Sequence, residues 1–189
     1  YASGCSGDVT AGKYNDGSPA DRLKLIGRMM HGMQNAWENT KRVPLENVTF
    51  RNTQLQLDYS NDPDLSHERL LQRLEDDQLR VEDRILAAMG LSSRIRVAEG
   101  QAIDFPCIDL GAAQIVLFPG ESFVGYQLMA QRMRPDSFVV SIGYGECWPG
   151  YVPTAAAFAD NFEDKWLWTA PGAEERIRAA LTRILHPMD

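Results

Sequence analysis

The segment from residue 113 to residue 142 constrains the fold more than any other part of the sequence. A buried strand over 114–118 ends at Pro119–Gly120, a helix follows over 121–134, and a second apolar strand runs over 137–142. Two strands joined through a helix lie parallel in one sheet. The pattern therefore predicts an α/β fold with a mixed, partly parallel sheet flanked by helices, and in such sheets sites lie at the carboxyl ends of strands.

Apolar residues at three- and four-residue spacing predict the other helices. They mark helices over 18–39, over 70–89 and over 174–185. The second is either one long helix or two helices that break near Asp76–Asp77, and Gly90 is a plausible C-cap for it. The wide apolar stripe of the first helix is typical of a helix that faces the core.

Alternating apolar and polar residues predict the remaining strands, over 48–59, over 95–97 and over 103–110. No low-complexity segment, internal repeat or long linker divides the chain. We therefore expect residues 1–189 to form a single domain, or part of one.

The composition excludes several classes of function. The chain of 189 residues has a net charge of -7 and no cluster of Lys and Arg, which argues against binding to nucleic acid or to an anionic membrane surface. No apolar run approaches the roughly 20 residues that cross a bilayer, so we expect no transmembrane segment. Cys5, Cys107 and Cys147 form no CxxC pair, so no thiolate zinc site is indicated and at most one disulfide can form.

Gly7-Asp8-Val9-Thr10 is the first segment that could carry chemistry. An acid two residues before a hydroxyl can support a nucleophile, and Thr10 would need a base or a metal ion to activate it. The alternative is a structural turn in which Asp8 accepts hydrogen bonds from nearby backbone N–H groups.

Glu121 is the second candidate, because it follows a buried strand across the tight turn Pro119–Gly120. It could ligate a metal ion or act as a general base. The alternative is an acid that only stabilises the first turn of a helix through the helix dipole.

The aromatic loop that follows the last predicted strand is the third candidate. It holds Tyr144, Glu146, Trp148 and Tyr151 together with two glycines and a proline. Loops with such residues often line a binding site, and a tyrosine can ligate zinc when the ion lowers its pKa. The alternative is an aromatic loop that merely packs over the end of the sheet.

Together, the three segments resemble elements of the neutral, non-lysosomal ceramidases. Gly7-Asp8-Val9-Thr10 is similar to their Gly-Asp-Val-Ser element, Pro119-Gly120-Glu121 to the element that holds a zinc-binding glutamate, and Gly150-Tyr151-Val152 to the loop whose tyrosine completes the zinc sphere. The three elements occur in the family's order, and the resemblance covers most of the chain. It is closest to bacterial ceramidase-like proteins.

The resemblance implies a zinc-dependent amide hydrolase acting on N-acyl sphingosine or a related lipid amide. Thr10 and Asp8 would be the catalytic pair, Glu121 and Tyr151 two zinc ligands, and the aromatic loop a substrate-binding segment formed by Tyr144, Glu146 and Trp148. The family's two histidine ligands precede the Gly-Asp-Val-Ser element, so we expect them in an N-terminal portion of the same protein, either a cleaved chain or a missing segment. Most family members are exported, which implies a secreted or periplasmic location.

Departures from the family pattern keep other functions open. Thr10 replaces serine, Cys5 stands near a usual asparagine, and His31, His67 and His186 do not form a ligand set by themselves. One alternative is a non-catalytic binding or scaffold relative. Another is a hydrolase of a different polar amide or ester.

Overall fold

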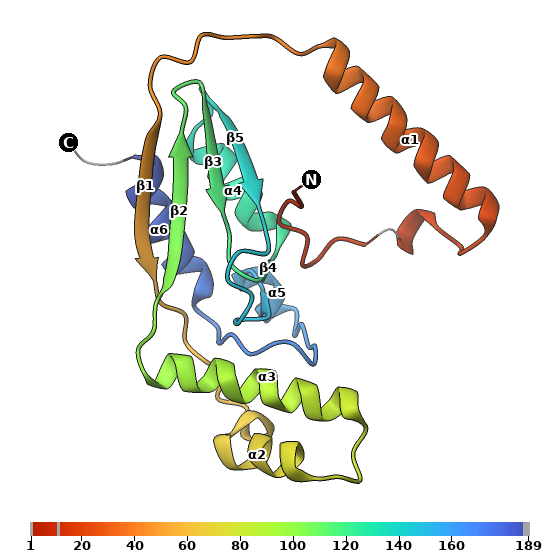
Figure 1. Ribbon diagram of the computed structural model, residues 1–189, viewed down its shortest axis with the longest axis vertical. Helices are drawn as coiled ribbons and strands as arrows, with labels where there is room; N and C mark the ends of the chain where they lie inside the picture. The colour runs from red at the N-terminus through yellow and green to blue at the C-terminus, as the bar shows by residue number, and fades with distance from the viewer. Residues whose placement is uncertain (1, 11, 187–189) are drawn as a thin grey trace.

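A four-stranded mixed sheet forms the centre of the computed structural model, which describes residues 2–10 and 12–186 (Figure 1). Strands β1 and β2 pair antiparallel, as do β2 and β3, whereas β3 and β5 pair parallel. The predicted α/β class with a partly parallel sheet is therefore confirmed. The strands lie in the order β1 (Thr49–Leu55), β2 (Ile103–Asp109), β3 (Ala113–Leu117) and β5 (Phe138–Ile142).

Helices α4 (Val124–Met133) and α6 (Ala173–Leu185) cover one face of this sheet (Figure 1). α4 connects β3 to β5 and is the predicted crossover helix. Successive side chains of a strand point to opposite faces, and alternate residues of β2, β3 and β5 are accordingly buried beneath the two helices. The core on this face includes Phe105, Val116, Tyr126, Val139, Ile177 and Leu181.

A helical hairpin, α2 (His67–Glu75) and α3 (Val81–Ala98), lies beyond one end of the sheet (Figure 1). Of the two alternatives that the sequence left open, the chain forms two helices with a break that includes Asp76–Asp77. The predicted C-cap at Gly90 is wrong, because Gly90 lies inside α3, where its lack of a side chain admits Trp168 and the hydroxyl of Tyr59. The predicted strand at 95–97 is also wrong, because α3 continues through these residues.

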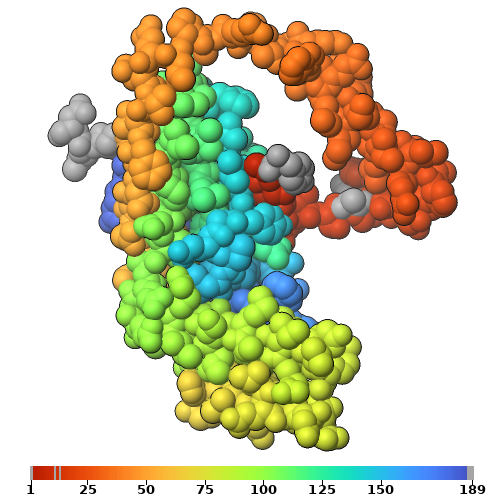
Figure 2. Space-filling view, viewed as in Figure 1, coloured from red at the N-terminus to blue at the C-terminus, as the bar shows by residue number. Residues whose placement is uncertain are grey.

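Helix α1 (Pro19–Glu38) has the predicted bounds but not the predicted environment. Ser18 caps it by accepting a hydrogen bond from the N–H of Asp21 at 3.2 Å. None of its residues is buried, and Leu23 and Trp37 are 70% and 82% exposed. Figures 1 and 2 show it standing away from the sheet on extended segments, so the prediction that it faces the core is wrong for this arrangement.

Several short elements were not expected. Residues 121–122 form a strand rather than the first turn of α4, and the loop after β5 contains a second short strand. The strand predicted over 48–59 ends at Leu55, beyond which only Tyr59 makes an isolated bridge, to Thr169. The short elements are η1 (Gly12–Tyr14), η2 (Pro63–Leu65), β4 (Glu121–Ser122), β6 (Tyr151–Val152) and α5 (Ala155–Ala159).

Among the helices described, none combines the length and the apolar character needed to cross a membrane. Within the described residues Cys5, Cys107 and Cys147 are free thiols, so the disulfide left open by the sequence does not form here.

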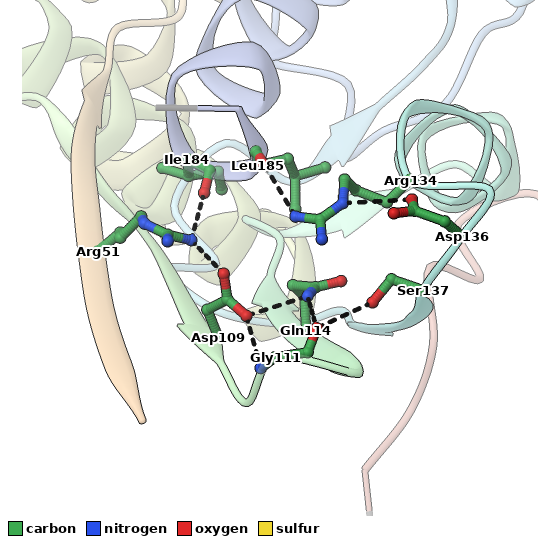
Figure 3. Close-up of polar contacts among 9 residues, drawn as sticks. All are labelled: Arg51, Asp109, Gly111, Gln114, Arg134, Asp136, Ser137, Ile184 and Leu185. Atoms are coloured by element: carbon green, nitrogen blue, oxygen red, sulfur yellow. Dashed lines mark hydrogen bonds and ion pairs between the residues drawn. The ribbon is translucent and has the colours of Figure 1, made fainter. Parts of the chain in front are cut away.

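A polar network fastens the end of α6 to the sheet (Figure 3). Arg51 donates to the carboxylate of Asp109 at 2.6 Å and to the carbonyl of Ile184 at 3.3 Å, and Arg134 donates to the carbonyl of Leu185 at 3.0 Å. The two arginines thus satisfy carbonyls that the last turn of a helix leaves unpaired. Burial alone opposes the charge on Asp109, but hydrogen bonds from Gln114, Arg51 and the backbone outweigh it and lower the pKa of this carboxyl.

Replacing Arg51 tests this network. The substitution Arg51→Met leaves Asp109 and a helix carbonyl without their charged donor, so the free energy of unfolding should fall by about 1–3 kcal/mol in urea titrations. The control Arg178→Met removes only an exposed pair with Glu174 and should cost less than about 1 kcal/mol. Equal losses in the two variants would contradict the assignment.

Candidate functional site

Two short parallel strands bring the carboxylate and the phenol of the predicted site together. β4 pairs with β6 so that Glu121 lies opposite Tyr151, beyond the carboxyl ends of β3 and β5. The N–H of Glu121 donates to the carbonyl of Gly150 at 2.8 Å. Gly120 and Gly150 both have positive φ, and a Cβ on Gly120 would overlap the Gly150 carbonyl oxygen, so only glycine permits this approach.

The N-terminal segment binds to the same pair of strands. The N–H of Gly7 donates to the carbonyl of Ser122 at 3.1 Å, and Asp8 accepts a hydrogen bond from the N–H of Val124 at 2.7 Å. Asp8 therefore caps the N-terminus of α4, where a carboxylate is favoured by the helix dipole. Asp8 and Glu121 are far apart in sequence, but both lie at the junction of β4 and α4, Asp8 through its hydrogen bond from Val124.

Thr10, the predicted nucleophile, is exposed. Its hydroxyl accepts a hydrogen bond from the N–H of Gly12 at 3.3 Å. Thr10 lies two residues after Asp8, which is held at the N-terminus of α4. No described contact fixes the Thr10 hydroxyl near Glu121 or Tyr151.

Tyr144, in the loop after β5, contacts both the N-terminal segment and the turn before β4. Its N–H donates to the carbonyl of Gly120 at 3.0 Å, and its hydroxyl lies 3.1 Å from the hydroxyl of Ser6. Its φ of 61° is unusual for a residue other than glycine. Tyr144 therefore links the N-terminal segment to the turn that precedes Glu121.

The ring of Tyr151 makes edge-to-face contacts with two other aromatic rings. Its centroid lies 6.3 Å from that of Phe123 and 5.6 Å from that of Phe162. Burial raises the pKa of the Tyr151 phenol, and the negative charges of Glu121 and Asp164 raise this pKa further. Burial and the charge of Glu121 likewise raise the pKa of the Cys147 thiol. Because the local charge is negative, a cation beside Glu121 would act in the opposite sense and favour the phenolate.

Glu146 and Trp148 are held by α3. Arg96 pairs with the carboxylate of Glu146 at 3.1 Å and lies over the ring of Trp148 at 5.9 Å. The hydroxyl of Ser93 donates to the carbonyl of Trp148. These contacts give both predicted substrate-binding residues a structural role in fastening the aromatic loop to α3.

Within residues 2–10 and 12–186, no group of three or more His, Cys, Asp and Glu side chains is arranged to hold a metal ion. His31 pairs with Asn35 on α1, and His186 contacts the carbonyl of Met133. Glu121 is of a residue type that binds zinc and Tyr151 lies opposite it, but none of the described histidines joins this pair.

Three residues near the site were missed by sequence reasoning. Ser6 adjoins the Gly-Asp-Val-Thr segment, and its position there was the only available signal. Phe162 and Asp164 had none, because they reach Tyr151 through an isolated bridge between Gly150 and Leu167 that long-range folding creates.

Comparison of this chain with family models, with curated proteins and with solved structures found no match. The resemblance to neutral ceramidases therefore remains a prediction from the three sequence elements and their order.

The attachment of the N-terminal segment can be tested at Gly7. A Cβ at this position would overlap the Glu121 carbonyl oxygen, so Gly7→Ala should detach residues 3–9 and lower the free energy of unfolding by about 1–3 kcal/mol. Limited proteolysis should then cut this segment faster. The control Gly12→Ala meets only ordinary contacts with Thr10 and should behave as the wild type. Unchanged proteolysis in Gly7→Ala would show that the segment is not anchored there.

The coupling between Glu121 and Tyr151 can be measured by titration. Glu121→Gln removes a negative charge, so the pKa of Tyr151 should move down toward the usual tyrosine value of about 10. The measurement is phenolate absorbance against pH, with the Tyr151→Phe spectrum subtracted in each background. Glu146→Gln, which removes a carboxylate paired with Arg96, should leave this titration in place. No shift in Glu121→Gln would mean that the two side chains do not interact.

Proposed function

We propose that this chain is part of a zinc-dependent amide hydrolase of the neutral ceramidase type, acting on N-acyl sphingosine or a related lipid amide. The observation that carries the proposal is the register pairing of Glu121 with Tyr151 on β4 and β6. These are the two residues that the resemblance implies as zinc ligands. They are separated by thirty positions in sequence, so their adjacency did not follow from either motif alone.

The anchoring of Asp8 gives the proposal a second support. The segment that resembles the family's nucleophile element is hydrogen-bonded to β4, the strand of the proposed glutamate ligand. Zinc bound at Glu121 and Tyr151 would polarise the amide carbonyl and acidify the attacking hydroxyl or water. In this arrangement Asp8 fixes the backbone that carries Thr10, and Thr10 supplies either the attacking hydroxyl or a hydrogen bond that orients water.

The remaining ligands are assigned by the proposal to an N-terminal portion of the same protein. A catalytic zinc has three or four protein ligands, of which histidine is the commonest, and the described residues offer two candidates. The N-terminal portion would bring two histidines to the edge defined by Glu121 and Tyr151. A secreted or periplasmic location belongs to the same proposal, through the family alone.

One observation favours a second candidate, a non-catalytic relative that binds without hydrolysis. The Thr10 hydroxyl is exposed and accepts a hydrogen bond from the Gly12 N–H, so it has a structural use that needs no metal. In that case Glu121 and Tyr151 would only stabilise the contact between β4 and β6.

Metal analysis separates the two candidates. The native assembly, purified without chelator, should contain about one zinc per copy together with an N-terminal companion or extension visible by intact mass. Glu121→Gln and Tyr151→Phe should each weaken zinc binding at least about tenfold, because each removes a ligand atom. Glu146→Gln, whose carboxylate pairs with Arg96, should retain zinc.

Amide hydrolysis is then assayed on the zinc-loaded assembly with N-acyl sphingosine and with polar amides. Hydrolysis that Thr10→Val abolishes supports the catalytic proposal. Zinc binding without hydrolysis of any amide would favour the non-catalytic relative. An assembly that binds no zinc when the N-terminal portion is present would overturn the metal site itself.

A further inference from the structure

One face of the central sheet has no covering helix, and its part formed by β3 and β5 is apolar. Toward the end of β1 and the start of β2 the same face also carries Asn52, Gln54 and Asp104, where both amides donate to the Asp104 carboxylate. The pairing registers place Phe50, Ile108, Ile115 and Val140 in one row across β1, β2, β3 and β5. This row points away from α4 and α6, since the buried residues of each strand alternate with it. Phe50 is 68% exposed and Ile108 38%, and the face lies open toward the viewer in Figures 1 and 2.

The composition of the β3–β5 part of this face is unusual for a sheet surface in contact with water. Antiparallel sheets with one solvated face place polar residues there, and parallel strands are normally covered on both faces. The parallel pair β3–β5 instead presents the partner residues Leu117 and Ile142 on the same face as Ile115 and Val140. The face, defined by these four residues with Phe50 and Ile108, has the character of a buried layer.

Helix α1 is the described element with a matching surface. Leu23, Ile26, Met30, Met33 and Trp37 recur at three- and four-residue spacing, and all are more than half exposed. Lys24, Arg28, His31 and Asn35 lie on the opposite side of the helix. Most of the stability of a helix in a protein comes from packing of its apolar face, so an apolar stripe of this kind indicates a partner surface.

We propose that α1 docks its apolar stripe on this open face of the sheet, within the same chain. Its length of about 30 Å exceeds by about one turn the diagonal, about 24 Å, of a sheet about 14 Å across its outer strands and roughly 20 Å tall, so the helix can cover the face diagonally. The arm that joins α1 to β1, residues 39–48, can span up to about 33 Å and is exposed throughout. The connection is therefore long enough for the helix to reach the face.

The chain segments on either side of α1 lie at opposite edges of the sheet, which is compatible with this docking. Residues 3–7 lie beside the end of β5, with the N–H of Gly143 donating to the carbonyl of Ser3 at 2.9 Å. Through the pairing pattern β1 runs parallel to β5 at the opposite edge of the sheet. A helix crossing the open face, in front of the sheet as seen in Figure 1, would therefore join a segment held at the β5 edge to the strand at the β1 edge.

The charge of residues 19–48 and their attachment to the rest of the chain also favour docking of α1 on its own sheet. Residues 19–48 contain five Lys and Arg and three Asp and Glu, whereas the whole chain contains 19 and 26. A net-positive helix is therefore attached to a net-negative body. Tethering by a short flexible arm gives an effective concentration in the millimolar range, which favours docking within the chain over exchange with a second copy.

The test is hydrogen–deuterium exchange of the metal-free chain, followed in peptides from residues 19–38. Met33→Lys removes an apolar contact of the stripe, Phe50→Lys removes one from the sheet, and Gln34→Lys is the matched control next to Met33. All three positions are exposed here, so the core of the sheet should survive each change, as exchange in β2 and β3 will report. Exchange in α1 should be at least about tenfold faster in Met33→Lys and Phe50→Lys than in the wild type and Gln34→Lys.

Acceleration of α1 by Phe50→Lys is the decisive result, because this residue lies outside the helix. Wild-type α1 that exchanges as fast as α1 in Met33→Lys would overturn the proposal. So would protection of α1 that appears only in a dimer, measured by light scattering at the exchange concentration, since the helix would then cover a second copy. The experiment uses neither zinc nor an amide, so its outcome is independent of the proposed hydrolase.

Discussion

The close approach of two backbone segments at Gly120 and Gly150 is the constraint on which the rest of the site depends. The N–H groups of Glu121 and Tyr151 donate to the carbonyls of Gly150 and Trp166, so three chain segments meet at this point. Each glycine has a positive φ and has no space for a Cβ. The crossover β3–α4–β5 then delivers both ends of this contact to the same edge of the sheet. The adjacency of carboxylate and phenol is therefore a property of the backbone more than of the two side chains.

The two faces of the sheet are stabilised by different means. The face under α4 and α6 has a packed apolar core, closed at one end by Arg51 and Arg134, which satisfy the last carbonyls of α6 (Figure 3). The opposite face is apolar on β3 and β5 and mixed on β1 and β2, and no helix among the described elements covers it. Because burial of apolar area is the main stabilising term in folding, the chain with that face open lacks part of the stabilisation its sequence encodes.

Sequence reasoning succeeded where local pattern and local environment agree. The crossover over 113–142 and the bounds of α1 and α6 follow from periodicity and capping, and both are confirmed. It failed where tertiary contacts override the pattern. Gly90 resembles a helix end but is needed inside α3 to admit Trp168, and residues 121–122 extend to pair with β6 before α4 begins. The partners of Tyr151 at 162 and 164 were beyond reach, because no local signal records which distant loop a strand will contact.

The position of Thr10 connects the proposed site at Glu121 to the docking of α1. Asp8 is fixed to the N-terminus of α4, and Pro19 begins α1, so Thr10 belongs to a short segment between one anchored point and one helix. With α1 away from the sheet, this segment has a single anchor, and the Thr10 hydroxyl bonds locally to Gly12. Docking of α1 would fix the other end as well and narrow the conformations open to Thr10. Orientation of this hydroxyl toward Glu121 would then depend on packing across the sheet, and not on the Gly-Asp-Val-Thr segment alone.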